Sequence, residues 1–253
     1  MPRLTWAGTD LTCDAFLGGR VQLWQPRRGY RAGVDPVLLA AAVPARAGDS
    51  VLELGCGAGA ALACLAARVP GLDLTGVEVQ ADYADLARRN LPGAAVVTAD
   101  LRALPDAIRT RQFHHVMMNP PYFDRTRGDG AADPGRDLGR AGDTPVGDWL
   151  DVGIRRLAPK GHLTLIQHIS RLPEVLAAVA GRLGSVVLCP LQPREGRAAT
   201  LFLVQARQGG RAPFAMRAPL ILHEGARHEA DREHYTPQLR AILRDAHPLD
   251  LRD

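Results

Sequence analysis

Residues 119–122, Asn-Pro-Pro-Tyr, are the residue types in this sequence best suited to binding a flat amine. They follow an apolar run that ends at Met118, which predicts a short buried strand stopped by two prolines. Because proline fixes φ and biases the preceding residue toward extended backbone, Asn119 and Pro120 should be held stiffly at the strand end. The Asn119 amide oxygen and the Pro120 carbonyl would offer two acceptors to an exocyclic amine, with the Tyr122 ring as a stacking surface.

The same four residues are equally typical of a rigid turn with an interfacial tyrosine. Pro-Pro pairs are common in turns that have no function of their own. The tetrapeptide alone therefore does not distinguish a substrate site from a purely structural turn. The residues upstream have to distinguish these two interpretations.

A glycine-rich turn at 55–59, Gly-Cys-Gly-Ala-Gly, lies between an apolar run and an alanine-rich segment. A strand, a glycine loop and a helix start allow a ligand to approach the backbone closely, especially at Gly55 and Gly57. Glu78 follows about 20 residues on, where an acid can bind ribose hydroxyls in the dinucleotide fingerprint. The loop alone thus fits a nicotinamide dinucleotide and S-adenosylmethionine equally well.

Two further acids distinguish these cofactors. Glu53 precedes the glycine turn, where it would repel a pyrophosphate but suit a cationic amino-acid end. Asp100, at the end of a third predicted strand, can accept a hydrogen bond from an adenine amine. Open α/β sheets bind ligands outside the carboxyl ends of their strands, and polar residues occupy four successive ends here: Glu53, Glu78, Asp100 and Asn119. This pattern favours a ligand site over packing.

The elements that must position these residues alternate between strands and helices. Helices are predicted at 60–69, 80–90, 146–157 and 170–183, and residues 160–161 are expected to form a turn. The predicted strands are 51–54, 72–78, 95–98, 113–118, 162–166, 185–189 and 200–206. The alternation predicts an α/β fold with a mostly parallel seven-stranded sheet, helices on both faces and an antiparallel edge made by the last two strands.

The segments on either side of this core divide the chain into three expected parts. Residues 1–47 should form a hairpin (14–31) and a helix that cover the cofactor site, with Asp35 as the helix N-cap. Residues 48–209 form the core, and residues 210–253 an extension packed on it, in which Thr236 caps a short helix. Residues 124–147 are rich in Gly, Asp and Arg, which is typical of a lid or a disordered loop.

Composition excludes several classes of protein. The chain has 253 residues, 46% of them hydrophobic, but no apolar run approaching a membrane span and no signal-peptide pattern. Its four cysteines form no Cys-x-x-Cys pair and its eight histidines show no ligand spacing, so we expect no metal and a cytoplasmic location. The net charge of +4 supports a nucleic-acid partner only weakly, because Arg and Ala richness also follows from biased base composition.

Taken together, these motifs resemble class I S-adenosylmethionine-dependent methyltransferases that act on planar amines. The closer resemblance is to the bacterial tRNA (adenine-N6)-methyltransferase family, which modifies the adenine beside the anticodon of a valine tRNA. It extends to Gln25, residues 29–31, Asp35, residues 157–161 and 219–223, and Tyr235-Thr236. Residues 124–147 and 224–234 depart from the family pattern, which leaves the particular RNA open.

The resemblance implies a Rossmann-like methyltransferase fold, S-adenosyl-L-methionine as cofactor and tRNA as partner. It implies catalytic roles for Asn119, Pro120 and Tyr122. The implied cofactor-binding residues are Glu53, Gly55, Gly57, Glu78, Asp100 and Arg31. Phe123, Arg125 and Arg127 would bind the RNA substrate.

Several alternatives stay open from the residues alone. The acceptor amine could belong to a guanine (N2) or adenine (N6) of ribosomal RNA, or to a protein glutamine (N5), although an N-terminal hairpin rather than a helical domain speaks against glutamine. A non-catalytic RNA-binding module with a vestigial cofactor fold is another possibility. A nicotinamide-dependent dehydrogenase is a third possibility, but the sequence offers no candidate proton donor to place beside the nicotinamide. A monomer is favoured over an oligomer.

Overall fold

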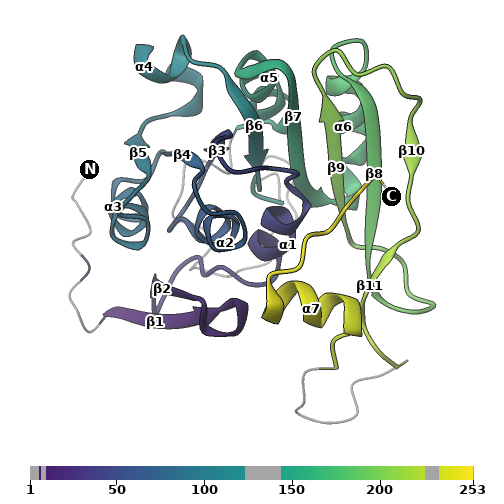
Figure 1. Ribbon diagram of the computed structural model, residues 1–253, viewed down its shortest axis with the longest axis horizontal. Helices are drawn as coiled ribbons and strands as arrows, with labels where there is room; N and C mark the ends of the chain where they lie inside the picture. Colours follow the sequence, from purple (N-terminus) through teal and green to yellow (C-terminus); the bar gives the residue numbers. More distant parts are fainter. Residues whose placement is uncertain (1–5, 7–9, 123–143, 226–233, 253) are drawn as a thin grey trace.

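A nine-stranded sheet runs through the centre of the computed structural model, which describes residues 6, 10–122, 144–225 and 234–252 (Figure 1). The strand order is β10-β8-β9-β7-β6-β3-β4-β5, and β11 also pairs with β8. The strands are β3 (Ser50–Leu54), β4 (Asp73–Glu78), β5 (Ala95–Thr98), β6 (Phe113–Met118), β7 (Leu157–His168), β8 (Gly184–Arg194), β9 (Leu201–Arg207), β10 (Ala215–Met216) and β11 (Leu220–His223).

Helices cover both faces of this sheet, which explains why its central strands bury apolar side chains on both sides. In β6, the buried Met117 belongs to the cluster on one face, whereas Val116 and Met118 belong to the cluster on the other. The first cluster includes α1 (Asp35–Ala42) and α2 (Ala60–Arg68), and the second includes α5 (Val146–Arg155) and α6 (Leu172–Val179). Two further helices, α3 (Ala81–Asn90) and α4 (Asp106–Arg109), precede β5 and β6.

The order of the strands separates this fold from a dinucleotide-binding domain. Strands β5-β4-β3-β6-β7 are parallel and follow the order 3-2-1-4-5. In the dinucleotide-binding order 3-2-1-4-5-6, the sixth strand would lie next to the fifth. Here the later strand β9 lies between β7 and β8, antiparallel to both.

All seven predicted strands are present, but the predicted total of seven strands in the sheet is wrong. The extension after β9 adds β10 and β11, both parallel to β8, so the described sheet has nine strands. A strand of two residues such as β10 is too short to show a period. β11 lies outside the alternation of strands and helices that identified the equally short β5. Two helices also end earlier than predicted, α5 at Arg155 and α6 at Val179.

The predicted turn at residues 160–161 is also wrong, because the chain continues through it as part of β7. Lys160 has a φ of 66°, and the register between β6 and β7 shifts here. A Cβ atom on Gly161 would lie 2.9 Å from the Ala158 carbonyl oxygen and 3.0 Å from that of His114. The residues that suggested a turn therefore accommodate an irregularity within a strand that passes close to its neighbour.

The N-terminal hairpin and the last helix lie at the lower side of Figure 1. The predicted hairpin is confirmed as antiparallel β1 (Leu11–Phe16) and β2 (Val21–Pro26). The predicted cap of the last helix, α7 (Pro237–Asp245), is confirmed, because the Thr236 hydroxyl accepts from the Leu239 amide at 3.3 Å. The chain after α7 returns to α1, where the Leu249 amide donates to the Ala41 carbonyl at 2.9 Å.

Three further findings concern the described residues only. No helix among them combines the length and the apolar character needed to cross a bilayer. The four cysteines are free thiols, and no group of three or more His, Cys, Asp or Glu side chains within the described ranges could hold a metal ion. The expected cytoplasmic location stays a prediction, and most of the predicted lid, 124–147, lies outside these ranges.

Candidate active site

The register of the central strands brings the predicted site residues to one edge of the sheet. Leu54 pairs with Val77 on one side and with Met118 on the other. Gly55 and Asn119 are therefore the first residues after two directly paired positions, on strands about 4.8 Å apart. Asp100 lies two residues beyond β5, which pairs with β4 as far as Glu78. The ends of four neighbouring strands thus converge, as an open α/β sheet requires.

A cleft of about 370 Å³ opens at this edge. It brings together three of the predicted cofactor residues, Gly55, Glu78 and Asp100. The lining residues are Gly55, Val77, Glu78, Val79, Ala99, Asp100, Leu101, Thr144 and Trp149. Apolar walls with a carboxylate on each of two neighbouring strand ends match a nucleoside, which presents flat apolar faces, ribose hydroxyls and an amine. Asn119 is not among the lining residues.

The glycine turn needs glycine for conformational and for steric reasons. Gly55 and Gly57 have φ values of 69° and 52°, which residues other than glycine rarely adopt. A Cβ atom on Gly55 would lie 2.5 Å from the ring of Trp149, so the indole of α5 packs directly on this glycine. The turn is thereby shaped by a residue that is about 90 positions away in the sequence but adjacent in the cleft.

Glu78 holds the glycine turn from the neighbouring strand. One of its oxygens accepts from the Gly57 amide at 2.9 Å, and the other accepts from the Gln80 amide at 2.9 Å. Burial raises the pKa of Glu78, while these two hydrogen bonds act in the opposite direction. Each carboxylate oxygen has further lone-pair capacity, so Glu78 can also accept from ribose hydroxyls.

Glu53 lies beneath the start of α2 and is only 3% exposed. Burial raises its pKa well above the usual value, and a hydrogen bond with the Leu62 backbone partly offsets this. Its Oε2 atom is buried without a hydrogen-bond partner in the described part of the chain. An unpartnered buried carboxylate oxygen is costly unless a ligand supplies a donor. Together with the glycine turn and Glu78, this orphaned acceptor fits the cationic amino-acid end of S-adenosylmethionine.

Asp100 is held in place by its own loop. It accepts from the Arg102 amide at 2.9 Å and forms an ion pair with the Arg102 guanidinium at 2.7 Å. Its side chain remains 35% exposed, and the residue lines the cleft. Its predicted contact with an adenine amine stays a prediction.

The loop after β6 leaves Asn119 open and anchors the two prolines. Asn119 is half-buried, and no hydrogen bond joins its side chain to the residues that the structure describes. The Pro120 and Pro121 carbonyls instead accept from the Gln167 side chain of β7, at 3.2 and 3.4 Å. Sequence reasoning missed Gln167. The available signal was a polar residue directly after the apolar run of a predicted central strand.

The predicted N-cap role of Asp35 is wrong. Val34 occupies the N-cap position, and Asp35 is the first residue of α1, followed by Pro36. The Asp35 carboxylate accepts a hydrogen bond of 2.6 Å from the Tyr122 hydroxyl. Burial, and then the nearby carboxylate, raise the pKa of Tyr122. The tertiary contact thus uses the carboxylate that the sequence pattern assigned to a local cap.

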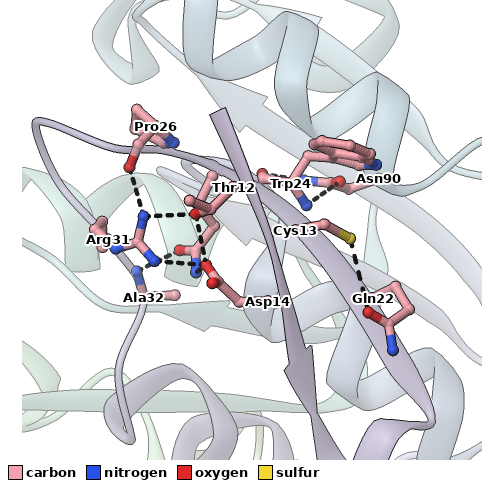
Figure 2. Close-up of polar contacts among 10 residues, drawn as sticks. Thr12, Cys13, Asp14, Gln22, Trp24, Pro26, Arg31, Ala32 and Asn90 are labelled. Atoms are coloured by element: carbon pink, nitrogen blue, oxygen red, sulfur yellow. Dashed lines mark hydrogen bonds and ion pairs between the residues drawn. The ribbon is translucent and has the colours of Figure 1, made fainter. Parts of the chain in front are cut away.

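Arg31 lies on the loop after β2 and points toward the N-terminal hairpin, as Figure 2 shows. Its guanidinium donates to the Thr12 hydroxyl and the Pro26 carbonyl, both at 2.8 Å, and pairs with Asp14 at 2.6 Å. Arg31 is not among the residues that line the cleft. Its predicted role toward the cofactor stays a prediction. Phe123, Arg125 and Arg127 lie outside the described residues, and their predicted roles stay predictions as well.

Comparison with known proteins agrees with this geometry. Residues 51–129 match the sequence model of a family described as "Methyltransferase domain". A crystal structure of a predicted O-methyltransferase from Agrobacterium tumefaciens superposes with a TM-score of 0.69 and 28% identity, over 86% of this chain and 99% of that one. A tRNA (m1A58) methyltransferase from Aquifex aeolicus shares the fold alone, with a TM-score of 0.51 and 15% identity over 73% of this chain and 72% of that one.

The chain has the Rossmann-like fold of class I S-adenosylmethionine-dependent methyltransferases and is similar to them in sequence. Among curated proteins it is similar to tRNA1(Val) (adenine(37)-N6)-methyltransferases. The protein from Dickeya chrysanthemi is 29% identical over 87% of this chain and 88% of its own length, and that from Tolumonas auensis is 28% identical over 71% and 77%. These matches confirm the resemblance inferred from the motifs.

Proposed function

We propose that this protein methylates the exocyclic N6 amine of an adenine in tRNA. The observation that carries the proposal is the position of Asn119, which follows β6 beside the glycine turn and whose side chain makes no hydrogen bond to the described residues. An amide oxygen left open at this place is an acceptor for a substrate amine. The names of the relatives from Dickeya chrysanthemi and Tolumonas auensis support adenine N6 in tRNA as the acceptor.

The chemical task of the site is to make a poor nucleophile reactive. The lone pair of an adenine amine is delocalised into the ring. If Asn119 Oδ1 and the Pro120 carbonyl oxygen each accept a hydrogen bond from one N–H of this amine, the nitrogen is drawn toward tetrahedral geometry. The same two oxygens stabilise the positive charge that develops on nitrogen, which combines preorganised electrostatics with positioning. A strong general base is unnecessary, because the methylated amine loses its proton readily after transfer.

The cofactor residues have separate tasks in this proposal. S-adenosylmethionine, when bound, supplies an electrophilic methyl group. Glu78 would bind the ribose hydroxyls and Asp100 the adenine amine, both from the cleft that they line. Glu53 would accept from the ammonium group with its unpartnered oxygen. Gly55 and Gly57 allow the backbone to approach the bound molecule closely.

Tyr122 would stack on the target base once that base has been extruded from between its neighbours in the RNA. Such stacking is worth about 1–3 kcal/mol per base. A base in a single-stranded loop is less costly to extrude than a paired one, which suits a loop of tRNA. The hydrogen bond to Asp35 limits rotation of the Tyr122 ring before the substrate arrives.

The proposal is tested by tritiated methyl transfer from S-adenosylmethionine onto total RNA from a strain that lacks this protein. Nucleoside mass spectrometry then identifies the product. We expect N6-methyladenosine in the tRNA fraction. N2-methylguanosine in ribosomal RNA, a 2′-O-methylated nucleoside, or transfer to protein glutamine in a parallel reaction would each identify a different acceptor and refute the proposal.

A further inference from the structure

A buried glutamine of β7 holds the carbonyls of both prolines in the loop after β6. Gln167 is 0% exposed, and its Nε2 atom lies 3.2 Å from the Pro120 oxygen and 3.4 Å from the Pro121 oxygen. Its Oε1 atom accepts from the His168 amide at 2.7 Å. Because the oxygen end of the amide is occupied by a donor, the two N–H groups have to face the proline carbonyls.

The loop depends on such an outside donor because of its own sequence. Proline has no backbone N–H, so two successive residues of the loop cannot anchor themselves by donating to neighbouring backbone. The buried Pro120 carbonyl needs a partner, and that partner comes from the next strand of the sheet. Gln167 directly follows the buried residues Leu165 and Ile166, and burying an amide among apolar side chains is costly unless its hydrogen bonds are made.

We propose that Gln167 is a positioning residue for methyl transfer. It orients the Pro120 carbonyl and occupies one lone pair of that oxygen, which leaves the second lone pair for the substrate amine. The inference rests on the proposed function, in which the Pro120 oxygen is one of the two acceptors. A small misplacement of such an acceptor reduces the rate strongly, because its effect depends on alignment with the reacting nitrogen.

The neighbouring strand supplies a matched control. Gln205 of β9 is also buried, with 3% exposure, and its Nε2 atom donates to the Ala42 carbonyl at the end of α1, 2.9 Å away. Both glutamines lie on central strands of the sheet, and each donates from Nε2 to backbone carbonyl oxygen outside its own strand, Gln205 to one and Gln167 to two. Only Gln167 contacts the loop that carries Asn119.

The experiment compares Gln167→Met with Gln205→Met in the full-length protein. Methionine keeps the length of the side chain and removes its hydrogen bonds. We measure steady-state methylation of tRNA, S-adenosylmethionine affinity by calorimetry and the midpoint of urea unfolding, with rates normalised to the protein that binds cofactor. We expect both variants to lose similar stability, whereas kcat falls at least about tenfold in Gln167→Met alone. Cofactor affinity should change less than twofold in both. Equal kcat values in the two variants would overturn the inference.

Gln167→Glu provides a second readout, which also decides the matter if the methionine variant does not fold. A protonated glutamate can donate one hydrogen bond to the Pro120 oxygen, whereas a carboxylate donates none and repels both carbonyls. We therefore expect kcat of this variant to fall relative to wild type as the pH rises, and to recover as the pH is lowered.

The other ionisable side chains around the loop, His168, Tyr122 and Asp35, are the same in both proteins, so the wild-type profile is the reference. A constant ratio of the two rates across pH would contradict the inference. An inactive wild-type protein would refute the proposed function instead. If another amine is the true acceptor, the same comparison is made with that substrate.

Discussion

The Tyr122 hydroxyl donates a hydrogen bond of 2.6 Å to Asp35 across 87 positions of sequence. This contact connects the loop after β6 to the first turn of α1. Burial raises the pKa of the phenol, and the carboxylate beside it acts in the same direction, so Tyr122 remains a neutral donor at the pH of any ordinary assay. The N-terminal part of the chain therefore helps to set the orientation of the aromatic ring proposed to receive the base.

We expect Tyr122→Phe and Asp35→Ala to lower kcat/KM for tRNA to a similar extent, by about tenfold. A hydrogen bond to a charged group contributes about 1.5–3 kcal/mol, and each variant removes the same bond. Because they share it, the double variant should be scarcely worse than either single one. Tyr122→Ala should be more severe, since it also removes the stacking surface. If the effects of Tyr122→Phe and Asp35→Ala were strictly additive in the double variant, the contact would not link the two residues functionally.

Replacing Asn119 should affect turnover rather than cofactor binding. In Asn119→Ala we expect kcat to fall about 10²–10³-fold, the usual effect of removing one preorganised group that acts in the transition state. The dissociation constant for S-adenosylmethionine, measured by calorimetry, should change less than twofold. A variant with wild-type turnover would remove Asn119 from the mechanism.

Glu53 should make the stability of the free protein depend on pH. Its folded-state pKa is raised well above the unfolded value, chiefly by burial, so the folded state binds the proton more tightly. The stabilisation is complete below the unfolded pKa and is lost as the pH rises through the raised pKa, by about 1.4 kcal/mol for each unit of difference. We therefore expect the free energy of unfolding to decline from pH 4.5 upward in wild type and to decline less in Glu53→Gln.

Urea unfolding of both proteins at a series of pH values measures this difference. Glu78, whose pKa is also raised, is unchanged in both proteins and contributes equally. Parallel profiles for wild type and Glu53→Gln would show that Glu53 is not the source of the dependence. With cofactor present, Glu53→Gln should bind S-adenosylmethionine more weakly, because the ammonium group loses its anionic partner.

An alanine at position 55 should destabilise the protein. The residue has a positive φ, and the new Cβ would meet the Trp149 ring at 2.5 Å. We expect Gly55→Ala to lower the free energy of unfolding by about 1–3 kcal/mol, the usual cost of overpacking, and to weaken cofactor binding at the deformed turn. Gly93→Ala is the control, because its Cβ would enter open space. Chemical denaturation that showed equal losses in the two variants would contradict the steric argument.

The central part of the fold could be read from the sequence because its signals are local. Apolar runs such as 116–118 indicate burial on both faces of a sheet, and the prolines and glycines that follow indicate where each strand ends. Because parallel strands place their carboxyl ends on one edge, the convergence of Glu78, Asp100 and Asn119 followed from the order of elements alone. The strands β10 and β11 did not follow, since β10 has only two residues and β11 lies outside the alternation of strands and helices in the core.

What the sequence by itself determined is therefore the parallel core and the edge at which its polar residues gather. Only the tertiary structure decided which groups hold them there. Asp35 had a sufficient local role as a helix cap, yet packing brought it to Tyr122. Gln167 gave no local signal of the prolines it holds, which lie 47 and 46 positions away. Hydrophobic periodicity is a property of neighbouring residues, whereas the partner of a buried polar group depends on how distant elements pack together.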